Sequence, residues 1–305
     1  ILRVLGPDEY HENVDNNAFT NVQAVYTLRA AERIHDMLLA DDPGRLTEIS
    51  GSIGLDDEMV ALWKDMAERM YIPEPEPETG LIEQFDGYFG LEDISPEKLG
   101  ERLKDPGEYW GWPNGIAYET QVIKQADVVQ LFCLHPDRYE RDLIRKNYDY
   151  YEPRTQHRSS LSPAVHSIVA ARTDHRRQAY AYFHTSCTID LYNTNPPVSG
   201  GTFIGGIHTA ACGIAWQMVA FGFAGFRAEE NHIRFEPNLP EEWNSVEFTL
   251  IYRCRELSVF VNREMISVRS VNSNTGDIEV RIGKKSWTLH PGETVEKSAG
   301  GREST

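Results

Sequence analysis

Apolar residues along the first two-thirds of the chain recur every three or four positions, the spacing of helices that bury one face. Within residues 21–40 they stand at Val22, Val25, Leu28, Ala31, Ile34 and Leu38. The same periodicity predicts helices at residues 56–71, 118–134, 137–149, 162–172, 176–192 and 207–221. The chain is therefore expected to begin with a helical region.

Two long segments between these helices are irregular. Residues 73–79 alternate proline with glutamate or threonine, and proline cannot continue a helix. Residues 102–115 combine several prolines and glycines with three aromatic residues, Tyr109, Trp110 and Trp112. Long loops in a compact domain are often functional. These aromatic side chains either stack on sugar faces or anchor the loop.

After Phe226 the hydrophobic pattern becomes alternating, which is typical of strands. Strands are predicted at residues 232–235, 246–253, 257–262, 265–270, 278–282 and 286–289. Residues 262–263 and 272–276 supply turns. We therefore expect a mainly helical region at residues 1–228, a small antiparallel β-sandwich at residues 229–297 and a disordered tail at residues 298–305.

Composition narrows the possible partners. The chain has 305 residues and a formal net charge of −17, which disfavours nucleic acids and anionic membranes. No apolar run reaches the roughly 18 residues that span a bilayer. Four widely separated cysteines without a Cys-x-x-Cys pair favour reduced thiols in a cytoplasmic protein. An anionic substrate must be held by local donors, because the overall charge repels it.

The segment at residues 6–21 is the best candidate for chemistry. Gly6-Pro7 forces a turn, and the carboxylates of Asp8 and Glu9 follow before helical periodicity begins. Such a turn on a rigid scaffold can project a general acid. On composition alone the simpler interpretation is favoured, that these carboxylates mark the start of a helix, where negative charge is favourable.

Four ordered motifs resemble those of glycoside hydrolase family 65, and the resemblance covers about residues 5–252. They are Gly6-Pro7-Asp8-Glu9-Tyr10, Lys124-Gln125-Ala126-Asp127-Val128, Tyr151-Glu152-Pro153-Arg154-Thr155 with Ser159-Ser160-Leu161-Ser162, and Gly205-Gly206-Ile207-His208. The resemblance implies that Glu9 is the general acid and that Asp8 tunes or orients it. It also implies sugar contacts by Lys124, Gln125 and Glu152, and phosphate contacts by Ser159, Ser160 and His208.

Each of these residues also has a simpler interpretation. Lys124 would otherwise be a solvated helix charge, and His208 a core histidine. Ser159 and Ser160 would be N-caps of the helix that starts near Ser162.

The resemblance implies an inverting phosphorolysis. Glu9 would protonate the glycosidic oxygen while phosphate attacks C1 from the opposite face, so that an α-glucoside yields β-D-glucose 1-phosphate and a free acceptor sugar. Kojibiose or nigerose is the expected disaccharide. Inorganic phosphate would be a co-substrate, and neither a metal nor an organic cofactor is expected. An inverting hydrolase would instead need a second carboxylate to activate water.

The family's architecture is a barrel of six helical hairpins, an (α/α)6 toroid, of which residues 1–228 would be the C-terminal part. The resemblance further implies a homodimer of the full-length protein. Two alternatives stay open. One is an α-glucoside hydrolase of the same family, similar to acid trehalases, and the other is a truncated, inactive sugar-binding fragment.

Overall fold

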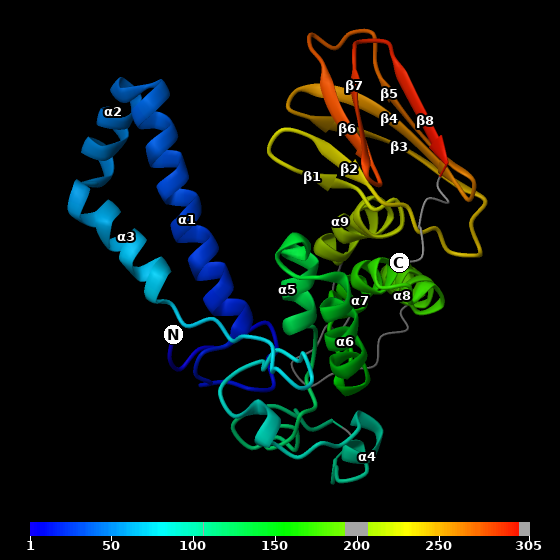
Figure 1. The fold of residues 1–305 in the computed structure, drawn as a ribbon. Coiled ribbons are helices and arrows are strands. Elements are labelled where there is room, and N and C mark those ends of the chain that lie inside the picture. Colours follow the sequence, from blue (N-terminus) through cyan, green and yellow to red (C-terminus); the bar gives the residue numbers. More distant parts are fainter. Residues whose placement is uncertain (106, 193–206, 299–305) are drawn as a thin grey trace. The chain divides into compact units, whose positions relative to one another are not determined.

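The structure is a computed structural model that describes residues 1–105, 107–192 and 207–298. It contains two compact units. The first comprises Ile1–Arg138 and Asp149–Gln156, and the second comprises Tyr139–Tyr148 and His157–Thr305. Helices and long loops make up the first unit, whereas helices followed by strands make up the second (Figure 1).

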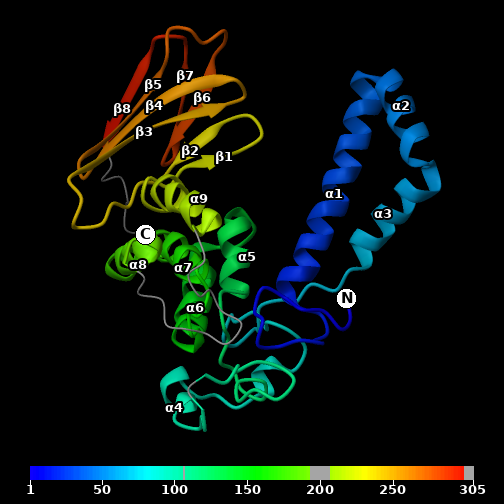
Figure 2. The ribbon, with the colours of Figure 1, turned by 180° about the vertical axis from the view of Figure 1, so that it is seen from behind.

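Three helices follow one another near the start of the first unit: α1 (Ala18–Asp41), α2 (Pro43–Ile53) and α3 (Asp57–Arg69). The side chains of Asn17, Asp42 and Asp56 cap them by accepting a hydrogen bond from a first-turn N–H group. α3 returns alongside α1 (Figures 1 and 2). The helices predicted at residues 21–40 and 56–71 are confirmed. α2 was not predicted, although Asp42-Pro43 is a cap followed by proline at the first helical position.

The remaining helices of the first unit are short: η1 (Tyr88–Gly90), α4 (Pro96–Gly100), α5 (Val128–Leu134), η2 (Pro136–Arg138) and η3 (Glu152–Arg154). Long loops connect them around an apolar cluster. Its buried members are Tyr10, Leu99, Trp110, Ala117 and Val122. The core of this region is therefore built from loop residues that come together from distant parts of the sequence.

The helix predicted at residues 118–134 is wrong for its first ten residues, since only α5 is helical. The preceding backbone bonds to other segments instead of to its own turns. The N–H of Gln121 donates to Glu92 O at 2.9 Å, and that of Ile123 to Arg154 O at 3.0 Å. The N–H of Lys124 donates to the Asp8 carboxylate at 2.9 Å. These tertiary bonds override the apolar spacing.

The helix α6 (Arg141–Tyr151) belongs to the second unit as far as Tyr148. The other helices of this unit are α7 (Ser162–Arg172), α8 (Arg176–Tyr192) and α9 (Thr209–Gln217), and α9 continues as the π-helix η4 (Met218–Phe223). α7 is buried along residues 162–171 because α8 and η4 both pack against it. The helices predicted at residues 162–172 and 176–192 have the predicted bounds. Those at 137–149 and 207–221 are present with shifted ends.

In the described part of the second unit, strands form two four-stranded sheets (Figure 1). One has the order β1 (Arg227–Ala228), β2 (Ile233–Phe235), β6 (Ile278–Ile282) and β7 (Lys285–Leu289). The other has the order β3 (Ser245–Tyr252), β4 (Arg255–Asn262), β5 (Met265–Ser270) and β8 (Thr294–Ser298). Alternate residues are buried, as in β4, where Leu257, Val259 and Val261 face inward. All six predicted strands are present.

The prediction of a purely antiparallel arrangement is wrong at one place, because β2 and β6 are parallel. No hairpin fixes their relative direction, since β3, β4 and β5 lie between them in the sequence. Two strands, β1 and β8, were not predicted. β8 pairs with β5 up to Ser298, the first residue of the predicted tail. Residues 299–305 of that tail lie outside the described residues.

The predicted fold class, mainly helical with strands towards the C-terminus, is confirmed at this level. The domain limits 1–228 and 229–297 stay a prediction. Across the parts of the chain that the structure describes, no helix is both long and apolar enough to cross a membrane.

We expect Leu257→Ala to destabilise the β region by about 2–5 kcal/mol, because it removes a fully buried side chain and leaves a cavity. Ile251→Ala on the adjacent strand is the matched control, since Ile251 is 75% exposed and should cost less than about 0.5 kcal/mol. Hydrogen exchange of peptides from residues 245–270, in the full-length gene product, measures both effects. Equal exchange in the two variants would contradict the assigned inner face.

Candidate active site

A short closed loop at residues 4–14, named the acid loop for its acidic residues Asp8, Glu9 and Glu12, carries the Gly-Pro-Asp-Glu-Tyr motif. Its ends are joined by two backbone hydrogen bonds between Val4 and Val14, of 2.9 and 3.1 Å. A Cβ atom at Gly6 would lie 2.5 Å from both Asn17 Nδ2 and Asp127 Oδ2. Glycine at this position therefore allows the loop to lie close to the start of α1 and to the residue that precedes α5.

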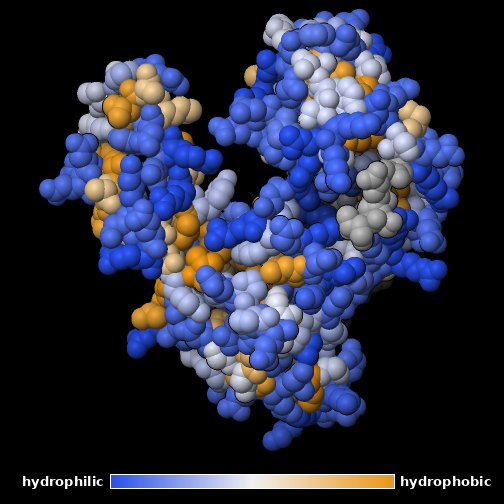
Figure 3. Space-filling view, in the orientation of Figure 1, coloured by the Kyte–Doolittle hydropathy of each residue, from blue (hydrophilic) through white to orange (hydrophobic). Residues whose placement is uncertain are grey.

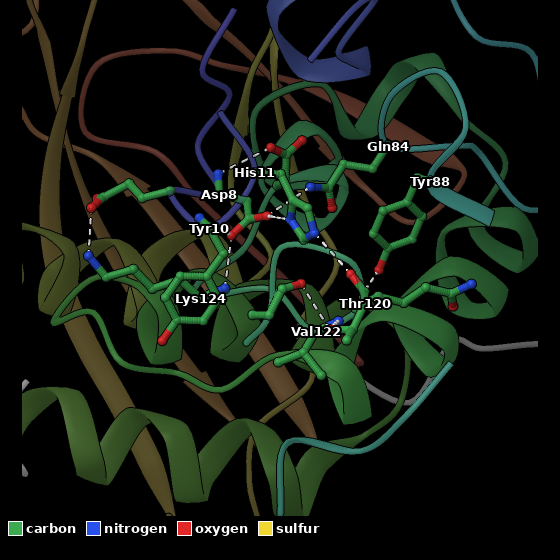
Figure 4. A network of polar contacts seen from close by, with 12 residues as sticks. Asp8, Tyr10, His11, Gln84, Tyr88, Thr120, Val122 and Lys124 are labelled. Carbon is green, nitrogen blue, oxygen red and sulfur yellow. Dashed lines mark hydrogen bonds and ion pairs between the residues drawn. The ribbon is translucent and has the colours of Figure 1, made fainter. Parts of the chain in front are cut away.

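Asp8 lies inside this loop and is 1% exposed. Its Oδ1 accepts hydrogen bonds from the backbone N–H groups of Tyr10, at 3.1 Å, and Lys124, at 2.9 Å. Its Oδ2 lies 2.6 Å from His11 Nδ1 and accepts from Gln84 Nε2 at 3.2 Å (Figure 4). The bond from Asp8 to the N–H two residues on closes a tight turn with Glu9 at its corner. This geometry fits the expected orienting role of Asp8.

His11 is buried, with oxygen atoms at both ring nitrogens. Nδ1 faces Asp8, and Nε2 lies 2.9 Å from the Thr120 carbonyl oxygen. An imidazolium donates from both nitrogens, so the surroundings suit the protonated ring. Burial opposes that charge, but the Asp8 carboxylate outweighs it and raises the pKa of His11 above its usual value. His11 and Asp8 therefore form a buried ion pair.

Asp127 is the second buried carboxylate of this network. It accepts from the Asp8 N–H at 3.2 Å and from Asn17 Nδ2 at 3.1 and 3.2 Å. Burial, followed by the charge of Asp8, raises the pKa of Asp127 to about 7. The side chain can thus hold a proton at moderately acidic pH, which lowers the number of buried charges.

On the exposed side of the turn, Glu9 meets two of the predicted sugar-binding residues. Lys124 Nζ lies 2.6 Å from Glu9 Oε2, and Gln125 Nε2 lies 3.3 Å from Glu9 Oε1. Gln125 also donates to the Pro7 carbonyl oxygen. The Lys124 side chain is 7% exposed and that of Glu9 is 44% exposed. The structure therefore brings Glu9, Lys124 and Gln125 together, while their roles stay predictions.

A strand-like pairing positions Lys124 and Gln125. The Ile123 N–H donates to Arg154 O at 3.0 Å, and the Gln156 N–H donates to Ile123 O at 2.8 Å. Tyr10 then donates its hydroxyl to Gln156 Oε1. Residues 152–156 are thus tied to both the Lys124 segment and the acid loop.

Glu152, the third predicted sugar-binding residue, begins the helix η3 and is partly buried. Its carbonyl oxygen accepts from the Thr155 N–H at 3.0 Å. The residue therefore belongs to the same unit as Glu9, on a segment bonded to that of Lys124. Its contact with sugar stays a prediction.

The aromatic loop at residues 109–115 is joined to the acid loop. The Tyr109 hydroxyl donates to Glu9 O at 2.6 Å, and the Trp112 N–H donates to Tyr10 O at 2.9 Å. Burial, then the charge of Glu9, raises the pKa of Tyr109 to about 12, so the phenol keeps its proton. Trp110 is 6% exposed and anchors the loop in the core. The sequence analysis singled out these aromatic residues but did not predict the contact between Tyr109 and Glu9.

Ser159 and Ser160, the predicted phosphate-binding serines, lie in the second unit just before α7. Ser159 Oγ accepts from the Leu161 N–H at 3.3 Å. Their simpler interpretation as N-caps is wrong, because Leu161 occupies the N-cap position and no side chain caps this helix. A contact with phosphate stays a prediction for both serines.

His208, the third predicted phosphate-binding residue, stands at the N-cap position of α9. Asp190 holds it twice, through the backbone N–H at 2.8 Å and through ring Nδ1 at 2.5 Å. The hydrogen bond with His208 lowers the pKa of Asp190. The His208 side chain is 14% exposed, so the interpretation as a satisfied core histidine stays open. Gly205 and Gly206 of the same motif lie outside the described residues.

A cluster that the sequence did not single out lies beside the serine motif. His157 contacts Ser162 Oγ through Nδ1 at 3.0 Å and the Tyr182 hydroxyl through Nε2 at 2.9 Å. His166 Nδ1 donates to Ser162 O at 2.9 Å. Burial lowers the pKa of His157 well below its usual value and that of His166 to about 4. In the sequence, the only indication of this cluster is that His157 lies within the third motif, between Thr155 and Ser159.

Among the residues that the structure describes, no group of three or more His, Cys, Asp or Glu side chains is placed to hold a metal ion.

Comparisons with known families place the chain in one of them. The Glycosyl hydrolase family 65 central catalytic domain matches residues 1–217, and the Glycosyl hydrolase family 65 C-terminal domain matches residues 226–289. The chain therefore belongs to glycoside hydrolase family 65.

Curated relatives are named as phosphorylases. A 1,2-alpha-glucosylglycerol phosphorylase from Bacillus selenitireducens is 50% identical over 93% of this chain and 37% of its own length. A nigerose phosphorylase from Lachnoclostridium phytofermentans is 38% identical over 88% of this chain and 36% of its own length. The chain thus spans little more than a third of these relatives.

A solved structure agrees with this family. It is described as a candidate kojibiose phosphorylase from the human microbiome, and it is 28% identical with a TM-score of 0.80. The match covers 98% of this chain and 38% of the solved one.

We expect Asp127→Asn to flatten the dependence of stability on pH between about pH 4 and about pH 7. The pKa of Asp127 is raised from 3.8 to about 7 on folding. Its stabilising protonation is therefore complete below the unfolded pKa and is lost as pH rises through the folded pKa. Asparagine has no such proton.

Urea unfolding midpoints of the full-length gene product and the variant, measured across this range, test the prediction. The variant should keep the pH dependence of stability that is due to His11. Because folding raises the pKa of His11, its contribution to stability is present below pH 6.5 and is lost as pH rises through the pKa of the folded state. Parallel curves for the two proteins would contradict a protonated Asp127.

Proposed function

We propose that the protein containing this chain phosphorolyses an α-glucoside with inversion, releasing β-D-glucose 1-phosphate and a free acceptor. The observation that carries the proposal is the turn that buries Asp8 and displays Glu9 beside Lys124 and Gln125. A partly exposed carboxyl on a tightly fixed turn is suited to proton transfer. The relatives named as phosphorylases support the same reaction.

In this reaction the protonated form of Glu9 gives its proton to the glycosidic oxygen, which also takes the electron pair of the breaking bond to C1, and Lys124 stabilises the Glu9 carboxylate that is left. A phosphate oxygen forms the new bond to C1 from the opposite face. Lys124, Gln125 and Glu152 contact sugar hydroxyls. Phosphate itself is held by Ser159, Ser160 and His208.

His208 stands at the start of α9, where the positive end of the helix dipole favours an anion, and the Asp190 carboxylate occupies its backbone N–H and ring Nδ1. Inorganic phosphate is the only co-substrate in this proposal, which includes no metal and no organic cofactor.

We also propose that residues 1–228 are the C-terminal part of an (α/α)6 barrel and that residues 229–297 are a C-terminal β domain. The hairpin of α1 and α3 supports the first point. Apolar surface is exposed along these helices (Figure 3), and their exposed side chains include Ile34, Met37, Leu62 and Met66. Exposed apolar surface of this kind marks a site of contact with further protein. A homodimer and a cytoplasmic location are proposals for the full-length protein.

The acceptor is the least constrained part of the proposal. The motifs favour kojibiose or nigerose, and relatives named for both sugars are 35% and 38% identical. The 50% identity to a 1,2-alpha-glucosylglycerol phosphorylase adds glucosylglycerol as a second candidate.

Product analysis of the full-length gene product tests the reaction. We expect β-D-glucose 1-phosphate by NMR after incubation with one of kojibiose, nigerose, maltose, trehalose or 1,2-α-glucosylglycerol, and only when phosphate is present. Glucose release that does not depend on phosphate would instead identify a hydrolase. Sugar binding without turnover would identify an inactive binding protein.

We expect Glu9→Gln to lower kcat on the α-glucoside substrate by about 10²–10⁴-fold, the usual contribution of a general acid. The same variant should retain phosphorolysis of α-D-glucosyl fluoride, because fluoride leaves without being protonated. Glu12→Gln is the matched control on the same loop and should change kcat by less than about threefold. A Glu9 variant that keeps its rate on the glucoside would remove Glu9 from the mechanism.

A further inference from the structure

We infer that Tyr109 is a positioning residue that holds the general acid Glu9 in its reactive place. This inference rests on the proposed function. The loop at residues 109–115 would then contribute to catalysis by fixing the position of Glu9.

The Tyr109 side chain contacts both members of the Glu9–Lys124 pair. Its hydroxyl donates to the main-chain carbonyl of Glu9 at 2.6 Å. The Lys124 ammonium lies 5.9 Å from the centre of its ring, which is within cation–π distance. Because the phenol keeps its proton to about pH 12, this hydroxyl is a donor over the working range of pH.

A second tether next to the first fixes the same stretch of main chain. The Trp112 N–H donates to the carbonyl of Tyr10, so two consecutive carbonyls bond to one loop. A Cβ at Gly111 would lie 2.9 Å from Tyr10 Cα, which shows how closely the two backbones approach. Asp8 holds the turn from inside through the Tyr10 N–H. The turn is therefore held from both sides.

Anchoring and positioning are divided between two residues of the loop. Trp110 is buried and stacks on Tyr10, with ring centroids 6.4 Å apart, so it supplies the apolar anchor. Tyr109 is only partly buried, and its hydroxyl group is hydrogen-bonded to Glu9 itself. Removing the Tyr109 hydroxyl should thus keep the packing and release only the Glu9 carbonyl.

Tyr109→Phe in the full-length gene product tests this role. We expect kcat on the α-glucoside to fall about ten- to a hundred-fold, because displacements near 1 Å have effects of that order. The KM for phosphate should stay unchanged. Phosphorolysis of α-D-glucosyl fluoride, which needs no acid, should stay within about twofold of wild type.

Tyr252→Phe is the matched control, since it removes a hydroxyl that donates to a carbonyl, that of Glu229, at 2.7 Å in the β region. It should leave both substrates unaffected. Equal losses of Tyr109→Phe on the glucoside and the fluoride would reduce Tyr109 to a structural residue, and an unchanged kcat would overturn the inference. A wild-type protein that forms no glucose 1-phosphate would overturn the proposed function, and the inference with it.

Discussion

The burial of one carboxylate, that of Asp8, is the constraint on which the candidate site depends. An ionised group away from water is costly unless donors surround it. Asp8 obtains four: the N–H groups of Tyr10 and Lys124 and the side chains of His11 and Gln84. They belong to three segments that are far apart in the sequence. Satisfying this carboxylate therefore assembles the turn and places the Lys124 ammonium beside Glu9.

Charge balance explains the rest of the network. The ring of His11 faces a carboxylate and a carbonyl and suits the charged form, which neutralises Asp8. Asp127 then remains as an excess buried anion, and a proton on it removes that charge, in keeping with its raised pKa. The interior of the acid loop can thus be neutral overall. Glu9 and Lys124 form a separate pair at its partly exposed side.

The sequence predicted what depends on local pattern and missed what depends on distant contacts. Apolar periodicity identified α1 and α3, and alternation identified strands such as β4. Residues 118–127 have helix-like apolar spacing, yet their backbone bonds to Glu92, Arg154 and Asp8. The motifs singled out Glu9 and Lys124 as site residues, but not the contact between them, which the structure adds. They could not reveal the contact between Tyr109 and Glu9, because it joins positions 100 residues apart.

The same network bears on the choice between phosphorolysis and hydrolysis. An inverting hydrolase needs a second carboxylate as base, roughly 6.5–9.5 Å from the acid. Asp8 and Asp127 are the carboxylates most closely tied to the acid loop, but donors occupy both oxygens of each. Both carboxylates therefore serve to hold the turn that presents Glu9, which suits them poorly to activating water. In the proposed phosphorolysis, phosphate brings its own nucleophilic oxygen, so the reaction needs no second carboxylate as base.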